Sequence, residues 1–143
     1  MHASLLSSNI GNSDEVLVPS FSFISTANAA LFVDSKPIFV DIEEETFGMD
    51  PKLIEPNISS KTKAIIPMDY GGQSCKIFEI KEKARQNNLL LIEDAAESLG
   101  SKVKGSKVGS VSDIAIFSFC GNKVLTTGEG GAIVTNSKEK FEK

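Results

Sequence analysis

Short apolar runs recur along the chain at intervals of roughly 25 residues, which is the spacing of strands that alternate with helices. The runs lie at 16–19, 37–40, 64–67, 89–92, 114–117 and 132–135. Each run is continuous and does not alternate with polar residues, a pattern typical of strands that are buried on both faces. The sequence therefore predicts six strands inside a covered sheet.

Helical patterns fall between these runs. Residues 26–33 are apolar and rich in alanine, and apolar residues follow one another at helical spacing within 76–88. Asp50 and Pro51 have the form of an N-cap followed by proline in the first helical position. Strands alternating with helices indicate βαβ units, so we predict a three-layer α/β/α domain with a mostly parallel sheet.

Polar residues follow four of the runs, at the point where each strand is expected to end. These residues are Asp41, Asp69, Asp94 and Ser118. Ligands of open α/β sheets bind beyond the carboxyl ends of the strands, although a strand can also end in a polar residue because it reaches water. Asp94 is followed by the letters AAE without a turn residue, so its carboxylate stays near apolar neighbours and favours a cationic partner. Tyr70 and Asp69 belong to the same expected edge, with no role assigned.

Composition and charge exclude several classes of function. A net charge of -4 and the absence of a basic stripe argue against a nucleic-acid binder, and no apolar run approaches the length of a membrane span. The two cysteines, Cys75 and Cys120, form neither a disulfide framework nor a zinc motif, which favours a cytoplasmic protein. The single histidine, His2, leaves no Ser-His-Asp site and no His-rich metal site, so no metal is expected.

Nucleotide-binding motifs are matched only in part. Residues 100–107 contain Gly-Ser-Lys where a P-loop requires Gly-Lys-Ser/Thr, and the glycines at 128–131 precede a strand where a Rossmann turn follows one. There remains Lys123, in the loop SFCGNKVLTTGEGG, together with Asp94. A lysine that forms a Schiff base with pyridoxal phosphate (PLP), with a carboxylate on the ring nitrogen, is one use of such a pair among several.

Five segments in the same order carry a resemblance to a known family. They read DEVLVPSFSFISTANAALF, KPIFVDIEEETFGMDP, TKAIIPMDYGGQ, LLLIEDAAESLGS and DIAIFSFCGNKVLTTGEGGAIVTN. From about residue 14 to its end the chain resembles the DegT/DnrJ/EryC1/StrS sugar aminotransferases, and within them the GDP-perosamine synthase-like branch. The resemblance implies part of the large domain of a PLP-dependent aminotransferase of fold type I, acting as a homodimer. It also implies glutamate as amino donor and a nucleotide-linked keto-sugar as acceptor, for cell-surface or secondary-metabolite sugars.

The resemblance also implies roles for five residues. Lys123 is the Schiff-base lysine, Asp94 pairs with the pyridinium nitrogen, and Glu97 approaches the phenolic oxygen of the cofactor. Ser118 bonds the phosphate, and Phe23 stacks on the ring. For Phe23 the alternative is a place in the core, and for Glu97 it is a solvated position at the start of a helix.

Members of the family are much longer than this chain. We therefore expect residues 1–143 to be a partial large domain, without the Gly-Thr-type phosphate-binding segment that precedes it and without the small C-terminal domain. One alternative function is a non-catalytic remnant or interaction module. A lower alternative is a related sugar dehydratase, but those relatives carry histidine where this chain has Lys123.

Overall fold

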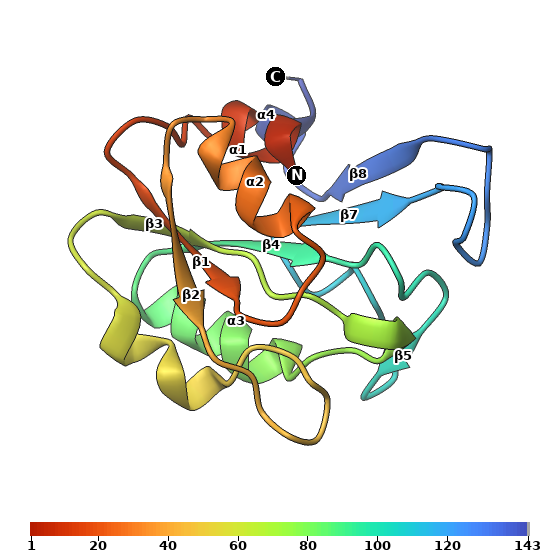
Figure 1. Ribbon diagram of the computed structural model, residues 1–143, viewed down its shortest axis with the longest axis horizontal. Coiled ribbons are helices and arrows are strands. Elements are labelled where there is room, and N and C mark those ends of the chain that lie inside the picture. The colour runs from red at the N-terminus through yellow and green to blue at the C-terminus, as the bar shows by residue number, and fades with distance from the viewer. Residues whose placement is uncertain (143) are drawn as a thin grey trace.

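The protein is described by a computed structural model over residues 1–142, and within them it is built on a six-stranded sheet in the order β2-β1-β3-β4-β7-β8 (Figure 1). The strands are β1 (Glu15–Pro19), β2 (Lys36–Val40), β3 (Thr62–Ile65), β4 (Leu90–Asp94), β7 (Ile114–Ser118) and β8 (Gly131–Thr135). Neighbouring strands pair in parallel from β2 to β7, whereas β8 runs antiparallel to β7. The prediction of a mostly parallel α/β sheet is confirmed.

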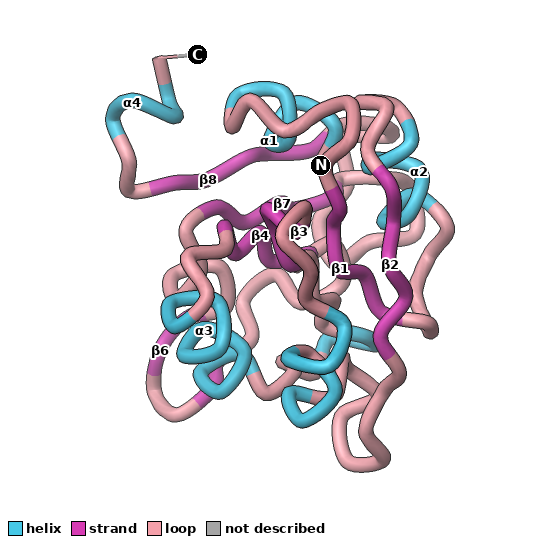
Figure 2. The backbone as a smooth tube through the Cα atoms, turned by 90° about the vertical axis from the view of Figure 1, so that its left-hand side faces the viewer, coloured by secondary structure: helices cyan, strands magenta, loops and turns pink. Residues whose placement is uncertain are grey.

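Helices cover both faces of this sheet, as Figures 1 and 2 show. Helices α1 (His2–Ser7) and α2 (Ser25–Leu31) lie on one face, and α3 (Ile77–Gln86) lies on the other. Shorter elements complete the described fold: η1 (Pro51–Leu53), η2 (Glu55–Asn57), η3 (Tyr70–Gly72), the hairpin β5 (Lys102–Val103) and β6 (Ser106–Lys107), and α4 (Lys138–Phe141). None of the described helices is long and apolar enough to cross a membrane.

The core is divided by the sheet into two clusters. Val16 and Val18 of β1 pack with residues of α1 and α2, whereas Leu17, between them, packs with Ile77 and Ile80 of α3. Alternate side chains of a strand point to opposite faces, so a strand covered on both sides must be apolar at consecutive positions. The continuous apolar runs of the sequence thus arise from the three-layer arrangement.

Helix α3 follows the predicted spacing, since Ile77, Ile80 and Ala84 are buried. Its end is defined by Asn88, which has a φ of 53°, a left-handed conformation that asparagine tolerates. The predicted cap at Asp50 is also present, because its carboxylate accepts a hydrogen bond from the Lys52 amide at 2.9 Å. However, the helix that follows it is a single 3₁₀ turn, and Glu55 begins another within a few residues.

The prediction that each strand is buried on both faces is wrong for the two outer strands. Phe39 of β2 is 56% exposed, and Ile133 and Val134 of β8 are also exposed. These strands form the two edges of the described sheet, where each has one neighbouring strand and less cover from the helices. Apolar composition alone does not distinguish an edge strand from a central one, because burial depends on which elements pack nearby.

Candidate functional site

Asp94 is the last residue of β4 and is nearly inaccessible to solvent, with 2% of its surface exposed. Its Oδ2 accepts a hydrogen bond from Thr26 Oγ1 at 3.0 Å, and its Oδ1 accepts one from the Ala96 amide at 3.2 Å. Burial raises the pKa of Asp94, and these two hydrogen bonds offset part of that rise. A cation placed at this carboxylate would offset the burial further, so the site suits a protonated ring nitrogen.

Lys123 lies in the loop between β7 and β8, and its amide donates to the Cys120 carbonyl at 3.0 Å. Its Nζ forms an ion pair with Glu97 Oε1 at 3.3 Å, and both side chains are partly shielded from solvent. The other oxygen of Glu97, Oε2, accepts a hydrogen bond from the Gly71 amide at 2.8 Å. Since Glu97 follows Asp94 by three residues, the amine and the buried carboxylate belong to the same edge of the sheet.

Ser118 ends β7, the strand next to β4, and is half-buried. Its Oγ accepts a hydrogen bond from the Cys120 amide at 3.3 Å, which leaves the hydroxyl proton available for an anion. Opposite Ser118 lies Gly131, where an added Cβ would come within 2.7 Å of the Phe117 carbonyl oxygen. The two strands therefore approach each other closely beside this hydroxyl.

Phe23 lies just before α2 and is 67% exposed. The alternative that this ring belongs to the core is therefore wrong. Its carbonyl accepts a hydrogen bond from the Thr26 amide at 3.0 Å, so its backbone belongs to the helical turn whose Thr26 contacts Asp94. An exposed aromatic ring at this position is available to stack on a planar ligand.

Two hydroxyl residues near Asp94 escape prediction from the sequence. Thr26 is buried and donates to Asp94, and its Oγ1 lies 2.7 Å from Ser22 Oγ. Ser22 in turn donates to the sulfur of Met68 at 3.1 Å. The one available signal was a pair of hydroxyl residues four positions apart at the start of a helix, which is common in helices without any such role.

The remaining polar strand ends do not join the site. Asp69 is fully buried and bonds the Cys75 amide and the Ser98 hydroxyl, each at 2.9 Å. Asp41 follows the edge strand β2, three strands away from β4, and is exposed. Tyr70 packs against Phe21, with 4.4 Å between the ring centroids and 44° between the ring planes. These side chains follow or end parallel strands, so they share the carboxyl edge of the sheet as expected, but only Asp94 and Ser118 are given a role in the candidate site.

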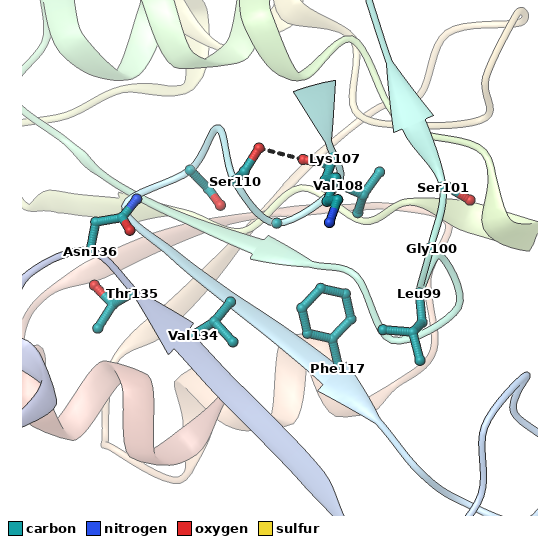
Figure 3. A pocket seen from close by; sticks show the side chains of 12 residues that line it. Leu99, Gly100, Ser101, Lys107, Val108, Ser110, Phe117, Val134, Thr135 and Asn136 are labelled. Carbon is teal, nitrogen blue, oxygen red and sulfur yellow. Dashed lines mark hydrogen bonds between the residues drawn. The ribbon is translucent and has the colours of Figure 1, made fainter. Parts of the chain in front are cut away.

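A hollow of about 450 Å³ lies apart from these residues (Figure 3). It opens between the β5–β6 hairpin and the strands β7 and β8, and its walls include Leu99, Phe117 and Val134. None of the five predicted site residues lines it. It is therefore a separate feature on the other side of β7.

The groups at the edge of β4 and β7 match the chemistry of PLP. An amine can form an imine with the aldehyde, and a buried carboxylate can pair with the protonated ring nitrogen. A hydroxyl can donate a hydrogen bond to the phosphate, and an aromatic ring can stack on the face of the pyridine. The fold is that of part of the solved PLP-dependent aminotransferases of fold type I, of which the chain covers 37% to 38%. The chain belongs to the DegT/DnrJ/EryC1/StrS aminotransferase family, whose sequence profile matches residues 1–143.

Known relatives agree with this assignment. The GDP-perosamine synthase of Caulobacter vibrioides is 46% identical over 139 residues, which are 97% of this chain and 38% of that protein. The S. venezuelae protein DesV, solved in complex with a ketimine intermediate, has a TM-score of 0.95 and 34% identity over 99% of this chain and 38% of its own. NtdA from Bacillus subtilis, solved with bound cofactor PMP, has a TM-score of 0.91 and 35% identity over 97% of this chain and 31% of its own. The chain spans 37% to 39% of the length of three of the curated relatives it matches.

Proposed function

We propose that this chain supplies the cofactor-binding part of an enzyme that transfers the amino group of glutamate to a nucleotide-linked keto-sugar. The observation that carries the proposal is the placement of the Lys123 amine on Glu97, three residues beyond the buried Asp94. The 46% identity to a GDP-perosamine synthase favours a GDP-linked sugar as the acceptor. The free state of Cys75 and Cys120 is compatible with action in the cytoplasm, where thiols stay reduced.

Each described residue has a definite task in this proposal. PLP, when bound, supplies an aldehyde that reacts with amines and a ring that withdraws electrons from the substrate. Asp94 would hold the proton on the ring nitrogen, Ser118 would donate to the phosphate and Phe23 would cover one face of the ring. Lys123 would hold the cofactor at its Nζ and serve as the base that moves a proton, while Glu97 would orient the amine.

Covalent labelling tests the assignment of Lys123. We expect incubation with PLP, followed by reduction with borohydride, to add the cofactor to the peptide that contains Lys123, as measured by mass spectrometry. Lys123→Ala should lose this label, because imine formation requires the amine. Lys107→Ala, which changes a lysine of the β5–β6 hairpin, is the matched control and should keep it. A label distributed evenly over the surface lysines, or unchanged in Lys123→Ala, would contradict the proposal.

We also propose that the chain assembles as a homodimer. Large apolar side chains are exposed on α2 and on the adjacent edge strand β2, notably Leu31, Phe32 and Phe39. Exposed apolar side chains on neighbouring elements favour association. Light scattering should give twice the 15.3 kDa mass of one chain, and Phe32→Glu should shift the species toward the monomer. A stable monomer at all concentrations would contradict this proposal.

A further inference from the structure

Two buried carboxyl groups lie directly behind the candidate site. Asp69 follows β3 and Glu93 precedes Asp94 in β4, and neither side chain is accessible to solvent. Both oxygens of Asp69 already accept hydrogen bonds, from the Cys75 amide and from Ser98 Oγ. Glu93 Oε2 accepts one from Ser112 Oγ at 2.8 Å, and the Gly109 amide also lowers the pKa of Glu93, whereas Glu93 Oε1 has no hydrogen-bond partner among residues 1–142.

These two carboxyl groups affect each other's ionisation. Burial raises the pKa of both, and the charge of Asp69 raises that of Glu93 further. A carboxylate cannot donate, so a hydrogen bond between the two groups requires a proton on one of them. Since Asp69 uses both oxygens as acceptors, the place for such a proton is Glu93 Oε1, the atom without another partner.

The pair is connected to both ends of the segment that carries the candidate site. Glu93 is joined to Asp94 by the backbone, and Asp69 bonds Ser98, which directly follows Glu97. We propose that Glu93 and Asp69, sharing one proton, are positioning residues that hold the segment 94–97 and thereby fix Asp94 and Glu97. The effect of this pair on catalysis rests on the proposed function, whereas the existence of the pair does not depend on it.

Few other ionisable groups act on the pair. The Cys75 thiol contacts Asp69, and burial together with the charge of Asp69 raises its pKa, so it stays neutral. Asp94, whose pKa is raised by burial and also by the charge of Asp69, is the third buried acid of the region. From the helix side, Ile77 and Ile80 present apolar surface in the same cluster as Cys75. No lysine, arginine or histidine forms an ion pair with Asp69 or Glu93 among the described residues.

The pair therefore makes the segment sensitive to pH. Burial, followed by the charge of Asp69, raises the pKa of Glu93 from 4.5 to about 7. A folded-state pKa above the unfolded value means that the native state binds more protons between these two values. The contribution of Glu93 to stability is fully present below pH 4.5 and is lost as the pH rises through about 7. Above that pH both buried groups are charged and repel each other, which disfavours the native conformation of segment 94–97.

Amide hydrogen exchange of the chain without cofactor tests the pair. The amides of Ala95, Ala96 and Ser98 are hydrogen-bonded within or beside the segment, to Ile116 O, Asp94 Oδ1 and Ala95 O. After correction for intrinsic rates, we expect their opening equilibrium to rise about tenfold or more between about pH 5 and about pH 8.5. Amides of the β1–β2 pair, far from Glu93, should rise much less.

Two variants separate proton sharing from simple packing. Glu93→Gln keeps the shape, because its amide can donate to Asp69 and accept from Ser112, so it should remove most of the pH dependence at these amides. Ser112→Ala removes a hydrogen bond that lowers the pKa of Glu93, so the pH at which the segment opens should move upward. Glu44→Gln, which neutralises an exposed carboxylate, is the matched control and should keep the native profile.

The proposal would be overturned if Glu93→Gln kept the native pH profile. It would also be overturned if this variant lost protection equally at the low and the high pH. A downward or absent shift of the midpoint in Ser112→Ala would do the same. Because no cofactor is present, these outcomes are independent of the labelling of Lys123. If the native chain takes up no label at Lys123 while the hydrogen-exchange results confirm the pair, the proposed function is refuted and the one-proton pair is retained.

Discussion

Asp94→Asn is expected to lower transamination by about three orders of magnitude or more, a loss of roughly 4 kcal/mol in transition-state stabilisation. The amide keeps the size of the carboxylate but removes the charge that, in the proposed function, holds a proton on the ring nitrogen. A neutral pyridine withdraws electrons poorly, so the substrate loses its proton slowly. Attachment of PLP at Lys123 should persist, because imine formation depends on the amine and the aldehyde.

This measurement requires an enzyme of full length, because the chain spans about 38% of its relative. Residues 1–143 can replace the matching segment of the Caulobacter vibrioides GDP-perosamine synthase, and the variants are then compared within that chimaera by turnover and by PLP labelling. Asp34→Asn is the matched control, since Asp34 is exposed with a φ of 58°, a conformation that asparagine also tolerates. Equal loss of label in Asp94→Asn and Lys123→Ala would show that Asp94 acts in folding and that the site is wrongly assigned.

Gly48→Ala should destabilise the chain by roughly 2–3 kcal/mol, at the upper end of the cost of overfilling a packed site. A Cβ at Gly48 would lie 2.5 Å from Cys75 Cβ and 3.2 Å from Cys75 Cα. The first atoms of a side chain cannot rotate away, so the backbone around Cys75 must move. That movement would disturb the hydrogen bond from the Cys75 amide to Asp69. Denaturant unfolding of wild type and variant measures the difference.

Gly11→Ala provides the comparison for this prediction. A Cβ at Gly11 would meet the Val33 carbonyl oxygen at 3.5 Å, which is ordinary van der Waals contact. We expect its effect on the free energy of unfolding to be within about 0.5 kcal/mol, as for most surface substitutions. If both alanine variants lose the same stability, the loss comes from replacing glycine as such and not from the contact with Cys75.

The sequence predicts the interior of this fold better than its edges. The apolar runs locate all six strands of the described sheet, and the spacing of Ile77, Ile80 and Ala84 locates α3. The antiparallel direction of β8 carries no such signal, since side-chain alternation is the same in either direction. Exposure of Phe39 escapes prediction because it depends on the absence of a packing partner.

The candidate site was predictable where chemistry is tied to sequence position, and less so where it depends on tertiary contact. Asp94 is recognisable because no turn residue follows it, and its burial is confirmed. Asp69 has the same position at the end of a strand, yet its carboxylate points into the protein to bond Cys75 and Ser98. Thr26 approaches Asp94 across 68 positions of sequence, a contact that only the packed fold creates.

The antiparallel pairing of β7 with β8 has a consequence for the order of folding. These two strands are consecutive in the sequence and can form a hairpin locally, whereas every parallel pair requires a crossover connection. Closing longer loops costs more chain entropy and slows the formation of non-local contacts. The loop of Lys123 can therefore acquire its shape early, and Asp94 reaches its final position when β4 docks between β3 and β7. Substitutions within the hairpin should act on the folding rate, while those around Asp94 should act mainly on the unfolding rate.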